Sequence, residues 1–316
     1  MKYTINLQLF AEMNTQTTAT GTLSPEMKTW YSDYLIDNAE PKLVHDQFGQ
    51  KHPIPKNGGK QIEFRKYNPL PKLLTPLTEG VTPDGQSLTV TTVTAEVAQY
   101  GGYITLSDML MLTAIDNNLV QATKLLGAQA GATLDTITRE VLNGGTNVVY
   151  AGGVESRGAV TGNLTVDDIK KAVRALKNQN AEKIGDSYVA IIHPDVTYDL
   201  TNDPTWQSVK DYDPADWYEG EIGKIAGVRF VETTEAKIFE GGIYSTLILG
   251  ENAYGVTEIE GGGLEHIVKQ LGSAGTADAL NQRATVGWKA TKVAERLVEQ
   301  FMVRVESKST FNGAAN

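Results

Sequence analysis

The sequence contains no cysteine, which excludes a disulfide scaffold, a thiolate zinc site and a cysteine nucleophile. It also has no apolar run near the ~18 residues that a membrane helix needs. Residues 1–12, MKYTINLQLFAE, carry a single lysine and alternate apolar with polar side chains. That pattern is typical of a short strand-like arm and not of a secretory signal. We therefore expect a protein without a membrane segment that is made and used in a cytoplasm.

Sequence motifs of catalysis are missing as well. No phosphate-binding GxxxxGK[ST], no GxGxxG that opens a helix and no HExxH occurs. Leu271 replaces the first glycine that the GxSxG nucleophile motif requires in LGSAG, residues 271–275. Among the four scattered histidines, only His193 stands where a catalytic base could stand, after an apolar strand and before Pro194. A structural turn residue is the simpler interpretation, so we predict no enzyme activity, no cofactor and no metal site.

Charge is unevenly distributed along the chain. The net charge is −10, which argues against general binding of phosphate groups. Residues 41–72 nevertheless hold seven basic and two acidic residues, a balance of +5 that leaves −15 for the rest. The basic residues are Lys42, Lys51, Lys56, Lys60, Arg65, Lys66 and Lys72. This region is either a solvated basic loop or a surface that attracts the acidic part of another copy. DNA binding is disfavoured because aromatic side chains for base stacking are not interleaved.

Residues 68–85, NPLPKLLTPLTEGVTPDG, combine large apolar residues with four prolines. Proline removes backbone donors, so this segment is neither a helix nor a central strand. The flanking residues 60–67 and 87–100 alternate as strands do, with a change of parity that predicts a β-bulge near Thr91 and Thr92. We expect a long two-stranded projection whose apolar tip must pack against another surface. The apolar residues are Leu70, Leu73, Leu74, Leu77 and Val81.

The remaining chain reads as an α+β protein. Ser24 and Pro25 predict the start of a short helix that ends before Pro41. A very long helix is expected from residue 107 or 108 to about Asn143. An amphipathic helix is expected to begin at Thr165, where Thr165 and Asp168 form a capping-box-like pair, and another helical turn is expected to start at His193 and Pro194. Strands are expected at residues 188–192, 228–232, 246–249, 286–293 and 297–305. The last two are expected to pack against the long helix, and residues 311–316 to be disordered.

An acidic and aromatic segment, DYDPADWYEGE, covers residues 211–221. Its spacing is not that of a twelve-residue calcium loop, so a solvated or partner-facing loop is the better interpretation. Aromatic residues are more usual at contacts than in open solvent. The candidate contact residues are Asp211, Asp213, Asp216 and Trp217.

Several stretches together resemble the major capsid proteins of tailed bacteriophages with the Hong Kong 97 fold, in the group typified by coliphage N-four. These stretches are LSPEMKTWYSDYLIDNAEPKLVHDQFG, KNGGKQIEFRKYNPL, the long-helix region, AIIHPDV, GEIGKIAGVRFVET and VGWKATKVAERLVEQFMVRVES, which cover most of the chain in order. The resemblance implies a Hong Kong 97-like fold with four parts. Residues 1–56 would be an N-terminal arm and residues 57–105 an extended β-hairpin loop. Residues 106–164 and 281–316 would form a peripheral domain with a spine helix, and residues 165–280 an axial domain.

The resemblance also implies partners and location. The chain would assemble with itself as pentamers and hexamers of an icosahedral head, with a separate scaffolding protein, a portal and decoration proteins as partners. The shell would enclose double-stranded DNA without sequence-specific binding, and the protein would pass from the host bacterial cytoplasm into the virion. The apolar tip, the nearby basic residues (Lys60, Arg65, Lys66 and Lys72) and the acidic loop would be the assembly interface. An encapsulin shell and a hydrolase that uses His193 are the alternatives.

Overall fold

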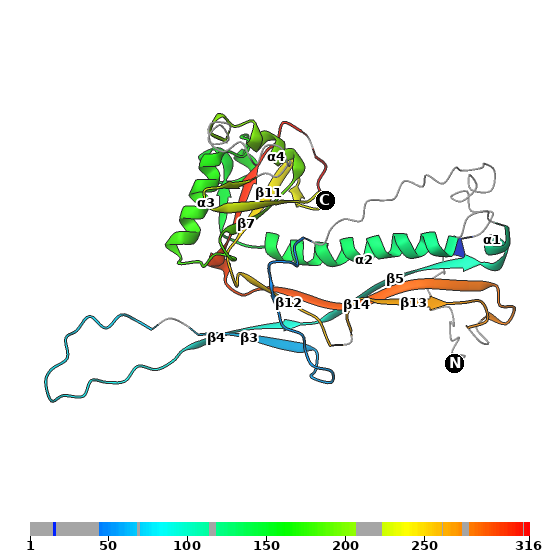
Figure 1. Ribbon diagram of the computed structural model, residues 1–316, viewed down its shortest axis with the longest axis horizontal. Coiled ribbons are helices and arrows are strands. Elements are labelled where there is room, and N and C mark those ends of the chain that lie inside the picture. The colour runs from blue at the N-terminus through cyan, green and yellow to red at the C-terminus, as the bar shows by residue number, and fades with distance from the viewer. Residues whose placement is uncertain are drawn as a thin grey trace, which may run out of the picture. The chain divides into compact units, whose positions relative to one another are not determined.

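A computed structural model (Figure 1) describes residues 15–16, 44–67, 70–113, 118–206, 223–260, 262–273, 278–311 and 313–316. The strand-like arm at residues 1–12, the helix expected after Ser24 and the acidic loop at 211–221 lie outside these residues. The chain divides into two compact units. Unit 1 comprises residues 1–40, 99–133 and 262–291, and unit 2 comprises residues 41–98, 134–261 and 292–316.

Unit 2 is built around a seven-stranded sheet in the order β6-β15-β11-β7-β9-β8, with β10 paired to β11. Every residue of β7, β11 and β15 is buried. The expected strands at 188–192 and 228–232 have those bounds, and the one at 246–249 is part of β11. The strands are β6 Val148–Tyr150, β7 Tyr188–Ile192, β8 Lys224–Ile225, β9 Val228–Glu232, β10 Ile238–Phe239, β11 Ile243–Leu249 and β15 Met302–Ser307.

Each face of this sheet has its own apolar core. Ile248 faces a cluster that includes Ile169 and Leu176 of helix α3 (Val166–Asn178). Leu247 and its neighbours on the other face pack with Val44, Leu142 and Tyr254. Burial on both faces explains why β7, with the sequence YVAII, is a continuous apolar run.

Helices α3 and α4 (Pro194–Thr201) begin as the sequence predicts. The Thr165 hydroxyl accepts a bond from the backbone N–H of Asp168 at 3.3 Å and donates to its Oδ2 at 2.7 Å, so the expected cap is confirmed. Helix α4 begins after His193, with proline in its first turn. Short 3₁₀ turns occupy Ala151–Gly153, Arg157–Ala159 and Glu299–Phe301.

Unit 1 contains β1 (Thr15–Gln16), β5 (Ala98–Ser107), β13 (Glu265–Lys269) and the first part of β14 (Arg283–Arg296). Strand β1 runs parallel to β5, and β13 runs antiparallel to β14. The later part of β14 belongs to unit 2, where it pairs with β12 (Tyr254–Thr257), which pairs in turn with β2 (Gln50–Lys51).

The long helix of the sequence prediction corresponds to two helices, α1 (Asp108–Thr113) and α2 (Asn118–Asn143). Residues 114–117 lie outside the described residues, so a continuous helix stays a prediction. Helix α2 alone is about 39 Å long at 1.5 Å per residue. Strand β14 contacts it as expected, because Trp288 Nε1 donates to Gln129 Oε1 at 3.2 Å and Arg296 donates to the carbonyl of Val141 at 2.7 Å.

The predicted projection is present as the antiparallel pair β3 (Gln61–Tyr67) and β4 (Val90–Glu96). The expected bulge at Thr91 and Thr92 is wrong, because Lys66 pairs with Thr91 and Arg65 with Thr92 in an unbroken register. The change of parity has another cause. Val90 is exposed and takes no part in the apolar face that Val93 and the residues after it form.

The end of the chain departs from the prediction in two places. Residues 299–301 form a 3₁₀ turn, so the last strand begins at Met302 and not at Leu297. The expected disorder of the tail is wrong for residues 313–316. Gly313 N–H donates to the Tyr244 hydroxyl at 2.8 Å, and Asn316 Oδ1 accepts from Ile238 N–H at 2.8 Å. The sequence of this short tail does not indicate that its hydrogen-bond partners lie on β10 and β11.

Candidate assembly interface

The apolar tip that the sequence singled out is bare on its own subunit. Residues 70–89, here called the tip loop, contain no helix or strand, and Figure 1 shows them leaving β3 and returning to β4 as an open loop. Within this loop, the backbone N–H of Val81 donates to the carbonyl of Thr78 at 3.1 Å and forms a turn. The exposed fractions are 50% for Leu70, 78% for Leu73, 85% for Leu74, 76% for Leu77 and 63% for Val81.

Three further apolar side chains extend this surface toward the hairpin. Tyr67, Leu88 and Val90 are also exposed. The sequence analysis missed them because alternation suggested that Leu88 and Val90 faced inward. Contiguous exposed apolar surface of this kind marks a contact surface more often than open solvent.

The basic residues of the hairpin lie in solvent. Lys60, Arg65 and Lys72 are exposed, whereas the side chain of Lys66 lies outside the described residues. Arg65 forms an ion pair with Glu63 at 2.9 Å, and this hydrogen bond raises the pKa of the guanidinium. Because both side chains are solvated, the pair adds little to stability. Of the other predicted contact residues, Asp211, Asp213, Asp216 and Trp217 lie outside the described residues.

The base of the hairpin, in contrast, is firmly packed. The Phe64 ring is buried against Gly255 of β12, where a Cβ atom would come within 2.9 Å of the ring. His52 meets the same ring edge-on, with the ring centroids 6.1 Å apart. Val97 N–H donates to the Lys60 carbonyl at 2.9 Å and closes the base. The hairpin is thus fixed at one end and uncovered at the other.

A hollow of about 400 Å³ lies beside this base. Its apolar wall comes from the inner face of the hairpin and from the end of β14 and the residues after it. Its rim is polar, and there Gln50 Nε2 donates to Asn252 Oδ1 at 2.5 Å. The lining residues are Gln50, His52, Ile62, Glu63, Phe64, Arg65, Val93, Asn252, Leu297 and Val298. All of them belong to unit 2.

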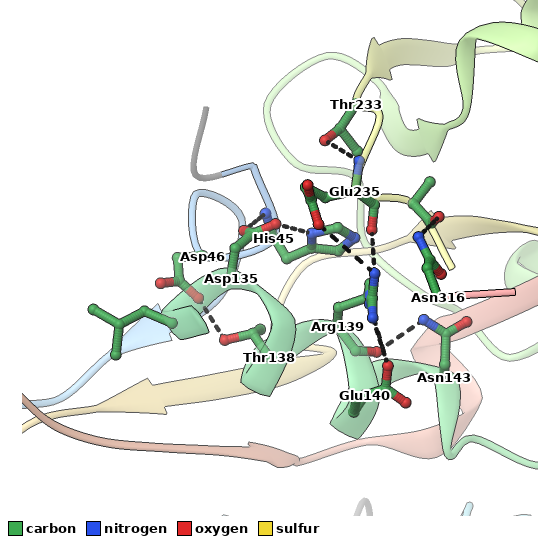
Figure 2. A network of polar contacts seen from close by, with 12 residues as sticks. His45, Asp46, Asp135, Thr138, Arg139, Glu140, Asn143, Thr233, Glu235 and Asn316 are labelled. Atoms are coloured by element: carbon green, nitrogen blue, oxygen red, sulfur yellow. Dashed lines mark hydrogen bonds and ion pairs between the residues drawn. The ribbon is translucent and has the colours of Figure 1, made fainter. Parts of the chain in front are cut away.

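A buried polar cluster fixes the chain just before the hairpin (Figure 2). His45 N–H donates to Asp135 Oδ1 at 2.8 Å, and His45 Nδ1 lies 2.6 Å from Asp135 Oδ2. Asp46 accepts bonds from Thr138 and from Lys292 Nζ, each at 2.5 Å. Burial lowers the pKa of Lys292, and the Asp46 carboxylate opposes that shift. The cluster joins residues 45 and 46 to α2 and β14, so His45 has a structural role.

Figure 2 also shows how the end of α2 is held in unit 2. The buried Arg139 guanidinium donates to the Glu235 carbonyl at 2.9 Å and pairs with Glu140 at 2.9 Å. Asn143 Nδ2 donates to the Arg139 carbonyl at 2.8 Å. The bond to Glu235 anchors the end of α2 to the rest of unit 2, whereas the other two bonds lie within the helix.

His193 serves as a helix cap. Its Nδ1 accepts the N–H of Asp195 at 3.2 Å, and the Asp195 carboxylate accepts the Tyr244 hydroxyl at 2.6 Å. Burial lowers the pKa of His193, and burial together with Asp195 raises the pKa of Tyr244 to about 12. Because capping and the Tyr244 bond use the ring nitrogen and the carboxylate, the arrangement favours the structural interpretation of His193.

The described part of the chain contains no group of three or more histidine, aspartate or glutamate side chains placed to hold a metal ion. None of its helices has the length and apolar character needed to cross a bilayer.

Comparisons with known proteins agree with the geometry. The sequence pattern of the family described as phage capsid protein matches residues 90–297. The capsid structure of cyanophage P-SCSP1u is similar at a TM-score of 0.67 and 12% identity, over 96% of this chain and 100% of that one. The cyanophage Pam1 capsid is similar at a TM-score of 0.67 and 14% identity, over 96% and 100%.

A third similar structure is the SrpI encapsulin complex of Synechococcus elongatus PCC 7942, at a TM-score of 0.56 and 10% identity over 93% of this chain and 97% of that one. No match was found among curated protein sequences. The structural likenesses show a Hong Kong 97-like capsid fold, and the family match covers about two thirds of the chain. The chain therefore belongs to the phage capsid protein family and is a major capsid subunit, many copies of which build the shell of a virion.

Proposed function

We propose that this subunit closes pentamers and hexamers into the icosahedral head of a tailed phage, and that the tip loop is its main contact with a neighbouring copy. The exposed leucines carry the proposal, since Leu73, Leu74 and Leu77 are each more than three quarters exposed. Burying such side chains gains about 1.5–3 kcal/mol each. A subunit that leaves them in water is incomplete until another copy covers them.

The finer identity belongs to the same proposal. The chain would be a member of the group typified by coliphage N-four. Residues 1–56 would be its arm, 57–105 the extended loop, 106–164 with 281–316 the peripheral domain, and 165–280 the axial domain. The acidic loop with Asp211, Asp213, Asp216 and Trp217 would face other copies, and the basic side chains Lys60, Arg65, Lys66 and Lys72 would favour that contact.

The proposed partners follow from the shell. A separate scaffolding protein, a portal and decoration proteins would join the assembly, which would form in the cytoplasm of the host bacterium. The net charge of −10 suits a wall that encloses double-stranded DNA without gripping it. We also propose that the subunit has no catalytic activity, because His193 is used as a helix cap.

The test is to replace both Leu73 and Leu74 with aspartate. We expect soluble, folded subunits that form no closed shells in negative-stain microscopy, because charged side chains do not enter an apolar contact. The matched control replaces Thr75 and Thr78 with aspartate, which adds the same charge to the same loop and should leave assembly intact. Normal particles from the leucine variant would contradict the proposal.

An encapsulin shell around an enzyme cargo is the second candidate, favoured by the likeness to the SrpI complex. The two candidates differ in what the particle contains. Nuclease-resistant double-stranded DNA in particles purified from infected cells would support a phage head. A protein cargo without such DNA would support the encapsulin.

A further inference from the structure

The hollow at the base of the hairpin and the leucines at its tip lie on the same subunit but at opposite ends of one element. Phe64 and Val93 pair with each other in the wall of the hollow, whereas the tip loop begins at Leu70, beyond the last pair of Tyr67 with Val90. The hollow has an apolar wall of Ile62, Phe64 and Val93, and Ile62 and Val93 are only half-buried. Its volume of about 400 Å³ lies within the range of ~300–1,000 Å³ that binding pockets have. It is large enough for apolar side chains and lacks an occupant from the described part of its own chain.

We propose that this hollow receives the Leu73–Leu74 segment of a second copy of the chain. The inference rests on the proposed function and names the surface that the tip loop meets. The tip loop offers isolated, extended leucine side chains, and the hollow offers an apolar wall behind a polar rim. The leucines lack apolar cover, and the hollow lacks apolar side chains to fill it.

Charge favours the same occupant. The rim carries His52 and also Arg65, which is paired with Glu63, while the exposed Lys51 lies between the lining residues Gln50 and His52 in the chain and the exposed Lys60 directly precedes β3. The tip loop beyond the leucines carries Glu79 and Asp84, against the single Lys72 before them. Opposite charges at the edge of an apolar contact favour one register of the contact over others.

Symmetry supports a second copy as the source. A contact between the tip of one subunit and the base of the next joins two different surfaces, so it is heterologous. Heterologous contacts close into rings when the rotation between copies allows it, and pentamers and hexamers are such rings. A leucine segment that folded back onto its own hairpin would fill the hollow but join nothing.

The absence of cysteine from the chain makes a direct test available. We would introduce cysteine at Leu74 and Val93 together, purify assembled particles, oxidise them mildly and separate the products on a non-reducing denaturing gel. We expect a ladder of covalent multimers, at least tenfold stronger than in either single variant. The matched control combines Leu74→Cys with Thr94→Cys, because Thr94 is the exposed neighbour of Val93 on the other face of β4.

Each outcome decides the inference. A ladder from the 74/93 pair that is missing from the 74/94 pair supports it. A monomer band with altered mobility shows that the loop closes on its own hairpin, and normal particles without a cross-link show that it docks elsewhere. Either result overturns the inference and leaves the shell function standing. Failure of the unmodified protein to form particles even when it is produced together with its scaffolding protein would instead refute the proposed function.

A second pair of variants covers the case in which the double cysteine variant forms no particles. Val93→Trp would fill the hollow, whereas Thr94→Trp would add the same bulk to the exposed face. We expect Val93→Trp to reduce the particle yield at least tenfold while its subunits still fold by circular dichroism, and Thr94→Trp to assemble. Particles in normal yield from Val93→Trp would overturn the inference.

Discussion

Leu74 in the tip loop is 85% exposed, whereas Ile248 in β11 is fully buried, although both are large aliphatic residues of one chain. The seven-stranded sheet of unit 2 packs against apolar clusters of its own subunit on both faces. The apolar side chains of the tip loop have almost no such packing within the subunit. One region therefore maintains the fold of the subunit, and the other is free to bind neighbouring subunits without a cost to that fold.

The largest expected difference between the sheet and the hairpin is the loss of stability when an ion pair is removed. Glu306 in β15 is fully buried and accepts bonds from Arg157 at 2.7 and 2.8 Å and from Arg304 at 2.8 Å. Replacing Glu306 with alanine should cost about 3–5 kcal/mol, because the buried Arg304 loses its counter-charge. Glu63→Ala in the hairpin should cost roughly 0–1 kcal/mol. Urea unfolding of unassembled subunits measures both, and equal losses would contradict the comparison.

Apolar side chains should differ in the same direction by a slightly smaller amount. Ile248→Ala removes buried methyl groups from the core and should lower the free energy of unfolding by about 2–5 kcal/mol. Leu74→Ala should change it by no more than ~0.5 kcal/mol, since water already surrounds that side chain. The same two proteins, compared in an assembly assay, should rank differently, with Leu74→Ala impairing particle yield. A large loss of subunit stability from Leu74→Ala would mean that the loop is packed in solution.

The smallest expected difference between the two regions is in how their variants change the pH dependence of stability. Because burial lowers the pKa of His193 below its ordinary value of 6.5, the unfolded chain binds the proton more readily than the folded one. The contribution of the neutral ring to stability is thus present above about pH 6.5 and is lost as the pH falls below it. His193→Asn keeps a capping side chain that does not titrate. Its urea midpoint should fall less than that of the unmodified protein between pH 7.5 and 5.5.

The tip loop supplies the control for that measurement. It contains no histidine, so Leu74→Ala should show the same pH profile as the unmodified protein. A His193→Asn profile parallel to that of the unmodified protein would contradict the assigned cause, because Asp195 and Glu232 beside the ring would then offset its burial completely.

Local patterns in the sequence anticipated the elements that depend on local chemistry. The cap at Thr165, the strand at 188–192 and the helix start after His193 all occur where the residues indicate. These features need only neighbours within a few positions. The exposed leucines were also recognisable, because prolines around them rule out regular structure.

Long-range partners were beyond the same reasoning. The hydrogen bonds of the tail at 313–316 depend on Tyr244 and Ile238, and the unbroken register of β3 with β4 depends on which side of β4 meets Phe64. The clamp of His45 with Asp135 joins residues 90 positions apart. No short window of sequence contains both partners of such a contact.

Sequence alone determined that an apolar, proline-rich tip would project between two strands and lack cover, because proline and alternation act locally. The tertiary structure decided which residues stabilise the fold of the subunit. It places β15 between β6 and β11 and buries Glu306 beside two arginines. It also decided where a hollow is left at the base of the hairpin, since Phe64 packs on Gly255 far along the chain. The physical reason is distance in sequence: packing and buried charge depend on residues that only the folded chain brings together.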